Sequence, residues 1–261
     1  ALMRLESPLD HDGWVALCHE TVARNAGALR RLPGGDAWLS LRLSPGVDGF
    51  AERVPGGRVP AKTVIAELRP LPLRARAAHY VDGVPLAAIA AHRRVPDACV
   101  PSEAKTHSYV AQHLANLAAA DVGALPLMLS VDGLVAEGST YNVFAVDDKG
   151  RLLTPTTDHC LAGVSRGACL RLARRLGLDA REVDLTLDDF KAADEAFVTS
   201  TSFCLCPVRS VDGARVGGPE VWGPVTTALR DAYVADCGVD FVRQYLDHLE
   251  EAPSEAPPTR P

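Results

Sequence analysis

The segment 125–154, LPLMLSVDGLVAEGSTYNVFAVDDKGRLLT, indicates the architecture of this 261-residue chain most directly. The apolar residues 125–131 are followed by Asp132-Gly133 and then by 134–136, a pattern typical of a β-hairpin. Residues 143–146, a turn at 147–150 and residues 152–154 predict a second hairpin immediately afterwards. Two consecutive hairpins favour a sheet with much antiparallel pairing.

Outward from this segment, helices and strands are mixed along the chain. Spacing of apolar residues and turn signals predicts helices at 12–32, 108–120, 165–176, 187–192 and 224–235. Further strands are predicted at 38–43, 63–68, 86–92, 196–199 and 205–209. The expected fold class is therefore α/β or α+β, and not a doubly wound sheet.

Changes in composition divide the chain. Residues 69–76 are rich in proline and arginine, and the last residues, EEAPSEAPPTRP, are rich in proline and glutamate. We expect a partial small α/β domain at 1–76, an interdomain linker at 77–84, a large domain at 85–249 and a disordered tail at 250–261.

Composition and charge exclude several classes of function. The formal net charge is −6, and no block of basic residues offers an electrostatic site for nucleic acid. No apolar run approaches the roughly 20 residues of a membrane helix, and no secretory signal pattern is visible. The seven cysteines are scattered and lack zinc spacing, so we expect reduced thiols, no metal and a cytoplasmic location.

Lysine is rare, which leaves few candidates for amine chemistry. Lys149 lies in an Asp-Lys-Gly turn and Lys191 in a charged helix, so both are expected to be exposed. Lys62 and Lys105 share an Ala-Lys-Thr context, and composition does not separate them. A lysine held away from solvent loses its proton and becomes a nucleophile or a Schiff-base partner.

Three further segments supply complementary chemistry, although each also fits an ordinary structural role. Glu137 follows an apolar strand, where a carboxylate can point into a cleft. Residues 161–166 form a turn that opens a helix, and residues 199–202 form a hydroxyl-rich turn; both arrangements bind anions. One amine, one carboxylate and two anion sites are the set that pyridoxal phosphate needs.

The order of these segments resembles the class IV aminotransferases, which are the fold-type IV pyridoxal phosphate enzymes. This family includes branched-chain and D-amino acid aminotransferases and aminodeoxychorismate lyase. The six matching motifs lie at 105–109, 137–144, 154–155, 161–166, 194–197 and 199–208. The resemblance implies a partial small N-terminal α/β lobe and a larger C-terminal pseudo-barrel lobe that binds the cofactor.

The resemblance also implies roles for four residues around the cofactor ring. Lys105 would form the Schiff base with pyridoxal phosphate and move the proton at the substrate's Cα. Glu137 would pair with the pyridine nitrogen, Leu161 would pack on one face of the ring, and Tyr109 would bond the ring hydroxyl. Of the two lysines in an Ala-Lys-Thr context, the resemblance thus selects Lys105 and not Lys62.

Phosphate and substrate binding are implied for the two turns. Val164, Ser165 and Thr201 would bind the cofactor phosphate, and the backbone amides of Thr201 and Ser202 would hold the substrate carboxylate. Arg4 would be a further phosphate ligand if residues 1–5 correspond to the family's His-x-x-Arg-Leu segment, with Ala1 in place of the histidine.

The chain departs from the family pattern in three places. Ser108 stands where the family usually has asparagine, the first strands of the small domain are missing, and Ser40 and Pro45 occupy a strand in which relatives often place an arginine. The missing strands indicate either a truncation or a shortened relative. The last departure leaves the choice of substrate open.

We expect an aminotransferase that moves an amino group from a branched-chain-like or related amino acid to a 2-oxo acid. One alternative is a carbon–carbon lyase of the aminodeoxychorismate type, and another is a truncated, non-catalytic relative. By analogy with the family, the partners are small molecules and a second copy of the chain in a homodimer, without nucleic acid or a membrane.

Overall fold

The structure, a computed structural model, describes residues 5–46 and 62–249. Arg4 and the tail expected at 250–261 lie outside the described residues. The chain divides into two units, the first ending at Leu73 and the second beginning at Arg74.

Unit 1 consists of helices and a two-stranded sheet. Its elements are α1 (His11–Arg24), α2 (Ala26–Leu29), the 3₁₀ turn η1 (Pro33–Gly35), β1 (Ala37–Ser44) and β2 (Thr63–Pro70). Asp10 begins α1 by accepting a hydrogen bond from the Gly13 amide at 2.8 Å. The single helix expected at 12–32 is interrupted at Asn25, whose amide group bonds back to the Thr21 carbonyl at 2.8 Å.

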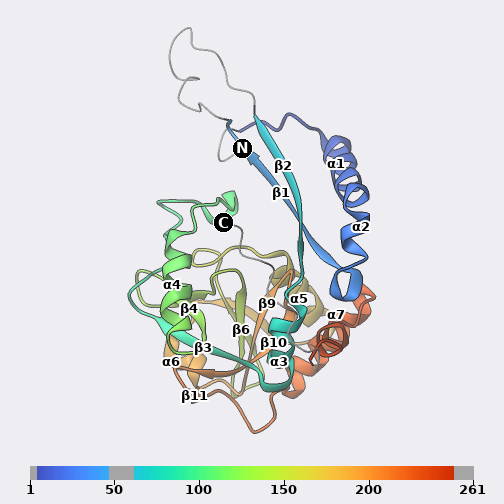
Figure 1. Cartoon of the computed structure of the whole chain (residues 1–261). Helices are drawn as coiled ribbons and strands as arrows, with labels where there is room; N and C mark the ends of the chain where they lie inside the picture. Colours follow the sequence, from blue (N-terminus) through green and yellow to red (C-terminus); the bar gives the residue numbers. More distant parts are fainter. Residues whose placement is uncertain (1–4, 47–61, 250–261) are drawn as a thin grey trace. The chain divides into compact units, whose positions relative to one another are not determined.

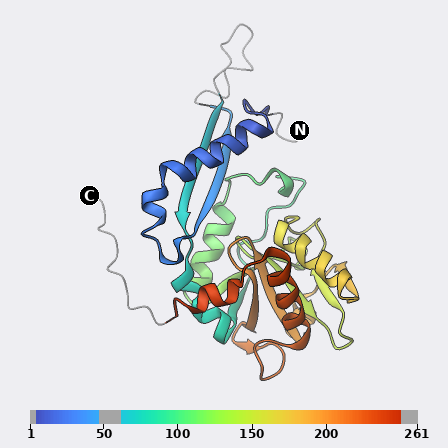
Figure 2. The ribbon, with the colours of Figure 1, turned by 90° about the vertical axis from the view of Figure 1, so that its right-hand side faces the viewer.

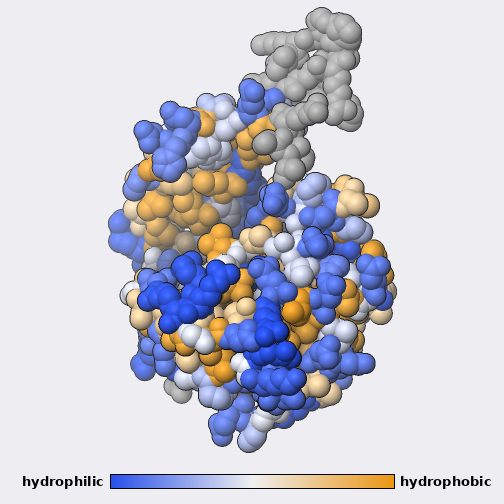
Figure 3. Space-filling view, turned by 180° about the vertical axis from the view of Figure 1, so that it is seen from behind, coloured by the Kyte–Doolittle hydropathy of each residue, from blue (hydrophilic) through white to orange (hydrophobic). Residues whose placement is uncertain are grey.

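One face of the unit 1 sheet is apolar. The antiparallel register pairs Leu39 with Leu68 and Leu41 with Ala66, so their side chains share a face. α1 packs on β2 and crosses the sheet (Figure 2). Leu39 and Leu41 remain 37% and 44% exposed, and apolar side chains gather over part of unit 1 in the space-filling view (Figure 3).

Residues 77–84, which we expected to form an interdomain linker, instead form most of α3 (Leu73–Asp82) and the start of β3. Ala77 and Tyr80 are buried on one side of this helix, and the Tyr80 hydroxyl donates to the Phe203 carbonyl at 2.6 Å. The helix was not predicted, because half-buried arginines and exposed alanines stand between its buried positions and leave no clear apolar face in the sequence.

Unit 2 is built on one mixed sheet (Figure 1). The strand order is β5-β4-β3-β10-β9-β6-β7-β8, and β11 pairs with β10. The bounds are β3 (Val84–Ile89), β4 (Leu125–Leu129), β5 (Val135–Glu137), β6 (Asn142–Val146), β7 (Leu152–Pro155), β8 (Ala180–Val183), β9 (Glu195–Ser200), β10 (Cys204–Val211) and β11 (Ala214–Arg215).

This sheet curls until its two ends approach each other. β5 begins the strand order and β8 ends it, yet the Val135 amide donates to the Leu185 carbonyl just beyond β8 at 2.8 Å. The expected pseudo-barrel lobe is confirmed, as are the two hairpins, β4–β5 and β6–β7. Parallel pairs join β3 to β4, β3 to β10 and β7 to β8.

Helices and short turns surround the sheet. They are the 3₁₀ turn η3 (Ser102–Ala104), α4 (Val110–Ala120), α5 (Val164–Arg175), α6 (Leu187–Lys191), α7 (Pro224–Cys237) and α8 (Phe241–Leu246). Phe144 and Phe197, which are cross-strand partners, stack in the core with ring centroids 4.9 Å apart. Within the described ranges, none of the helices has both the length and the apolar character needed to span a bilayer.

Candidate active site

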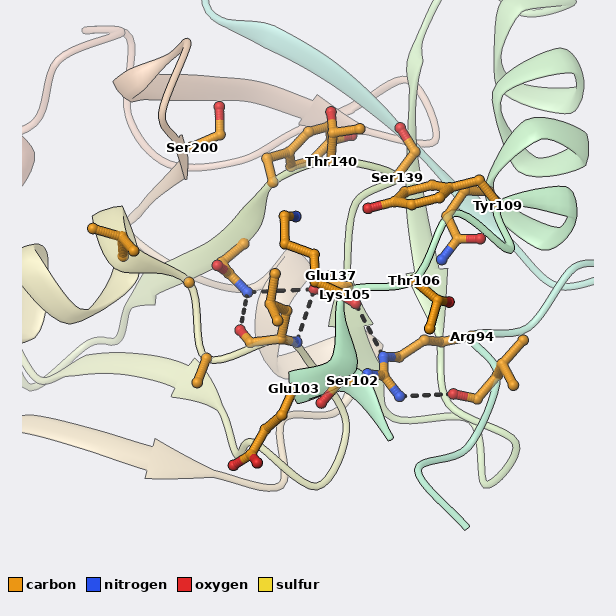
Figure 4. A pocket seen from close by; sticks show the side chains of 18 of the residues that line it. Arg94, Ser102, Glu103, Lys105, Thr106, Tyr109, Glu137, Ser139, Thr140 and Ser200 are labelled. Carbon is orange, nitrogen blue, oxygen red and sulfur yellow. Dashed lines mark hydrogen bonds and ion pairs between the residues drawn. The ribbon is translucent and has the colours of Figure 1, made fainter. Parts of the chain in front are cut away.

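The predicted site residues of unit 2 meet at one cavity of about 280 Å³. Those lining it are Lys105, Tyr109, Glu137, Leu161, Val164, Ser165 and Thr201. Figure 4 shows the Tyr109 ring projecting from the start of α4 toward the middle of this pocket. Ser202 is buried beside the cavity and is not among its lining residues.

Glu137 reaches the cavity because the turn after β5 is unusually tight. The Gly138 amide donates to the Tyr141 carbonyl at 2.7 Å. A Cβ on Gly138 would lie 2.0 Å from the Tyr141 ring, so this position admits only glycine. The turn brings Glu137, the last residue of β5, beside Asn142, the first residue of β6.

Three groups donate hydrogen bonds to the Glu137 carboxylate. Arg94 Nε lies 3.0 Å from Oε1, and the Leu161 amide lies 3.0 Å from Oε2. Asn142 Nδ2 is 3.4 Å from Oε2 and also donates to the Leu161 carbonyl at 2.9 Å. The carboxylate is therefore held in one orientation at the floor of the cavity.

Burial dominates the electrostatics of Glu137. It raises the pKa of this carboxyl above its usual value, while the Leu161 amide and the positive charges of Arg94 and Lys105 act in the opposite direction. These positive charges favour the ionised form of the Glu137 carboxyl.

The sequence analysis missed Arg94, the buried cation of the site. Its side chain is only 6% exposed, and its Nη1 donates to Asp97 Oδ1 at 2.9 Å and to the Val95 carbonyl at 2.7 Å. Burial opposes the charge, but Glu137 and Asp97 outweigh burial and raise the pKa of Arg94. The pair Arg93-Arg94 directly after the strand predicted at 86–92 was the available signal.

Lys105 follows η3 and lies at the cavity beside Glu137 (Figure 4). Its positive charge lowers the pKa of the Glu137 carboxyl, against the larger effect of burial. The expectation that this lysine is held away from solvent is wrong for this structure, because Lys105 is exposed. The lysine lies on a short turn at the cavity rim, where the neighbouring residues Glu103 and His107 are exposed as well.

The first predicted anion site is the beginning of α5. Gly163 is the N-cap, and the first helical bond runs from the Gly167 amide to the Gly163 carbonyl at 2.9 Å. The Val164 and Ser165 amides precede that bond and face the cavity end of the helix, where the dipole favours an anion. Tyr233 donates to the Ser165 hydroxyl at 3.3 Å and orients it.

The second predicted anion site is the turn after β9. The Phe203 amide donates to Ser200 Oγ at 3.0 Å, and Arg76 donates to the Ser202 hydroxyl. The Arg76 guanidinium also lies 4.0 Å from the centre of the Phe203 ring. These contacts fix the turn and leave Thr201 exposed at the cavity.

Two residues that line the cavity, Thr199 and Gln112, each carry a buried oxygen atom without a partner in the described part of the chain. Thr199 Oγ1 and Gln112 Oε1 have no hydrogen-bond partner among residues 5–46 and 62–249. An unpaired buried polar atom costs about 1–3 kcal/mol. The two anion sites, the Lys105 amine and the Glu137 carboxylate, which all line this cavity, fit a phosphorylated, nitrogen-containing ring.

The chain belongs to the class IV aminotransferase family, whose model matches residues 1–211. The branched-chain-amino-acid aminotransferase of Escherichia coli (strain K12) is 34% identical over 150 residues, which are 58% of this chain and 44% of that protein. The Pseudomonas aeruginosa enzyme of the same name is 42% identical over 107 residues, 41% of this chain and 34% of that protein. The aligned part thus spans less than half of these relatives. The resemblance carried by the six motifs is confirmed.

Solved structures of branched-chain amino acid aminotransferases are similar to this chain in fold. The branched-chain amino acid aminotransferase of Escherichia coli superposes with a TM-score of 0.76 and 28% identity, covering 96% of this chain and 77% of that one. The branched-chain amino acid aminotransferase from Thermobaculum terrenum, solved in its PLP-form, gives a TM-score of 0.72 and 25% identity, covering 95% and 76%. The fold expected from the resemblance, a fold-type IV enzyme, is confirmed.

Proposed function

We propose that this protein is a pyridoxal phosphate-dependent aminotransferase that transfers an amino group from a branched-chain or related amino acid to a 2-oxo acid. The observation that carries the proposal is that Lys105 and Glu137 line one cavity, together with residues of both predicted anion sites. The relatives named above are branched-chain enzymes, which favours transamination over the lyase alternative.

In this proposal the residues of unit 2 hold the cofactor. The Val164 and Ser165 amides and Thr201 bind its phosphate, and Leu161 packs on its ring. Tyr109 bonds the ring hydroxyl, as the resemblance implies. Arg4 stays a predicted phosphate ligand, since it lies outside the described residues. Pyridoxal phosphate supplies an aldehyde that bonds to an amine and a ring that accepts electrons.

Catalysis then requires this chain's residues to control protons at two places, the ring nitrogen of the cofactor and the Cα of the substrate. Glu137, held by Arg94 and the Leu161 amide, keeps a proton on the ring nitrogen. With the cofactor bound, Lys105 Nζ would be the amine that holds its aldehyde, and as a free amine Lys105 would move the proton at the substrate's Cα. The Thr201 and Ser202 amides hold the substrate carboxylate.

We further propose a homodimer in the cytoplasm. Support comes from one side of α4, where Val110, Leu114 and Leu117 recur at helical spacing and are 69%, 38% and 52% exposed. An exposed apolar stripe of this kind is typical of a surface that another chain covers. Light scattering that gives the mass of a single chain at micromolar concentration would contradict the dimer.

A coupled assay tests the activity. The purified protein with added pyridoxal phosphate should convert a branched-chain amino acid and a 2-oxo acid into the exchanged pair. The Lys105→Ala variant should abolish this conversion, whereas Lys149→Ala, which changes an exposed lysine, should leave it intact.

Three results would contradict the assignment. Equal activity in the Lys105→Ala variant would remove the proposed amine from the reaction. Pyruvate release from aminodeoxychorismate without an amino acceptor, in the absence of transamination, would establish the lyase alternative. If protein that retains its fold catalyses neither reaction, the remaining alternative is that the chain is a non-catalytic relative of the family.

A further inference from the structure

The segment that carries Lys105 is tied to the floor of the cavity through a single carboxylate. Asp97 Oδ1 accepts a hydrogen bond from Arg94 Nη1 at 2.9 Å, and Arg94 in turn bonds to Glu137. Asp97 Oδ2 accepts from both the amide and the hydroxyl of Ser102, at 3.2 and 3.0 Å. Asp97 thus joins the buried ion pair to the first residue of η3.

The other end of η3 fixes the lysine. The Lys105 amide donates to the Ser102 carbonyl at 2.9 Å, so the peptide groups on both sides of Ser102 are bonded, one through Asp97 and one through Lys105. A hydrogen-bonded path therefore runs from Glu137 through Arg94, Asp97 and Ser102 to the backbone of Lys105.

The backbone of Lys105 needs such support. Its φ is 40° and its ψ is 52°, the left-handed region in which a residue with a side chain is strained. Strained backbone persists only where surrounding contacts over-determine it. The bonds made by Ser102 are contacts of this kind, together with the bond from the Ala104 amide to the Pro101 carbonyl at 3.1 Å.

We infer that Asp97 is a positioning residue, which holds the Lys105 turn in its left-handed form and thereby sets Lys105 Nζ relative to Glu137. The inference rests on the proposed role of Lys105. Ionised Asp97 is the state that accepts all three bonds. Although partial burial opposes it, the bonds from Arg94 and Ser102 hold the pKa of Asp97 below its usual value. The side chain of asparagine has only one oxygen atom. In Asp97→Asn it therefore cannot accept from Arg94 at one oxygen and from Ser102 at another.

Amide hydrogen exchange in the cofactor-free protein tests the positioning without reference to activity. In Asp97→Asn, exchange of the Lys105 amide should accelerate about tenfold, the change that corresponds to the loss of one ordinary hydrogen bond. The matched control is Asp158→Asn, because Asp158 lines a second cavity together with Arg94 and Asp97 and is exposed. In Asp158→Asn the Lys105 amide should exchange at the same rate as in the parent protein.

Two exchange results would overturn the inference. One is an unchanged Lys105 amide in Asp97→Asn. The other is an equal acceleration in the core strand β6, since that would reveal general destabilisation instead of a local role.

The second readout is the rate at which added pyridoxal phosphate becomes fixed to Lys105 on borohydride reduction. We expect this rate to fall about tenfold in Asp97→Asn and to stay unchanged in Asp158→Asn. If the parent protein is never labelled at Lys105, the proposed function fails. If the parent is labelled and Asp97→Asn is labelled equally fast, only the positioning role fails.

Discussion

Arg94 Nε lies 3.0 Å from Glu137 Oε1, and both side chains are largely buried, at 6% and 14% exposure. Removing one member of a buried ion pair leaves the other charged and uncompensated, whereas removing both does not. The pair therefore links the stability of unit 2 to the carboxylate that we assign to the cofactor ring.

This relationship gives a prediction for a double-mutant cycle. Arg94→Met should lower the free energy of unfolding by about 3 kcal/mol. The double variant Arg94→Met/Glu137→Gln should lose clearly less than the sum of the two single variants, because no buried charge remains unpaired. Urea unfolding of the cofactor-free protein measures all three; strictly additive losses would show that the pair is not coupled.

Gly163 should be essential to the site for a steric reason. A Cβ there would lie 2.1 Å from Asn142 Oδ1, and Asn142 bonds to both Glu137 and the Leu161 carbonyl. Gly163→Ala should therefore weaken binding of pyridoxal phosphate at least about tenfold, as the loss of one such bond implies.

The matched control is Gly167→Ala in the same helix. A Cβ at Gly167 meets nothing within 4 Å, and alanine favours a helix by up to about 1 kcal/mol. Fluorescence titration with pyridoxal phosphate compares the two variants. Equal affinities for Gly163→Ala and Gly167→Ala would refute the steric argument.

Asp147 should make the β6–β7 hairpin sensitive to acid. Its Oδ1 accepts from the amides of Lys149 and Arg151 at 3.0 and 2.8 Å, and Arg151 Nε donates to Oδ2 at 2.6 Å. Burial opposes ionisation, yet these bonds hold the pKa of Asp147 below its usual value. Its stabilisation is complete above the unfolded pKa of about 3.9 and is lost as the pH falls through the lower folded value.

Asp147→Asn should thus cost about 1–2 kcal/mol at pH 7 and much less at pH 3. Asp148→Asn, at the exposed next position of the same turn, should cost little at either pH. Thermal melts at the two pH values provide the measurement, and a cost for Asp147→Asn that stays constant with pH would be inconsistent with this role.

Glu195 should anchor α7. Its carboxylate is buried and accepts from the Val225 and Thr226 amides at 3.0 and 2.7 Å, at the beginning of that helix. Glu195→Ala should destabilise the protein by about 2 kcal/mol, against no measurable change for Glu220→Ala at an exposed position.

Gly223→Ala should act like Glu195→Ala, because a Cβ there would lie 2.1 Å from Glu195 Cδ. Unfolding curves that match the parent protein for both variants would disprove the role of Glu195 as an anchor.

The hairpins could be predicted from the sequence because they are local, whereas the residues of the pocket were implied by the resemblance of six separate motifs to one family. The Asp132-Gly133 turn and the spacing from Glu137 to Asn142 are visible in a single stretch of chain. Arg94 was missed because its partner Glu137 lies 43 positions away and only the folded sheet brings them together. The helix at 73–82 was missed because its buried side is defined by contacts with residues near Phe203.

The exposure of Lys105 was also beyond reach from sequence. Its Ala-Lys-Thr context is shared with Lys62. This tripeptide does not predict the left-handed backbone that Lys105 adopts after η3. Solvent access at the rim depends on how the chain surrounds the residue, which no local pattern encodes.

The central claim is that Lys105 is the amine that bonds to pyridoxal phosphate opposite Glu137. The direct measurement is borohydride reduction of the protein after incubation with the cofactor, followed by mass spectrometry of its peptides. The account predicts one phosphopyridoxyl group per chain, on Lys105. Labelling of Lys62, Lys149 or Lys191 in its place, or the absence of any labelled lysine, would contradict it.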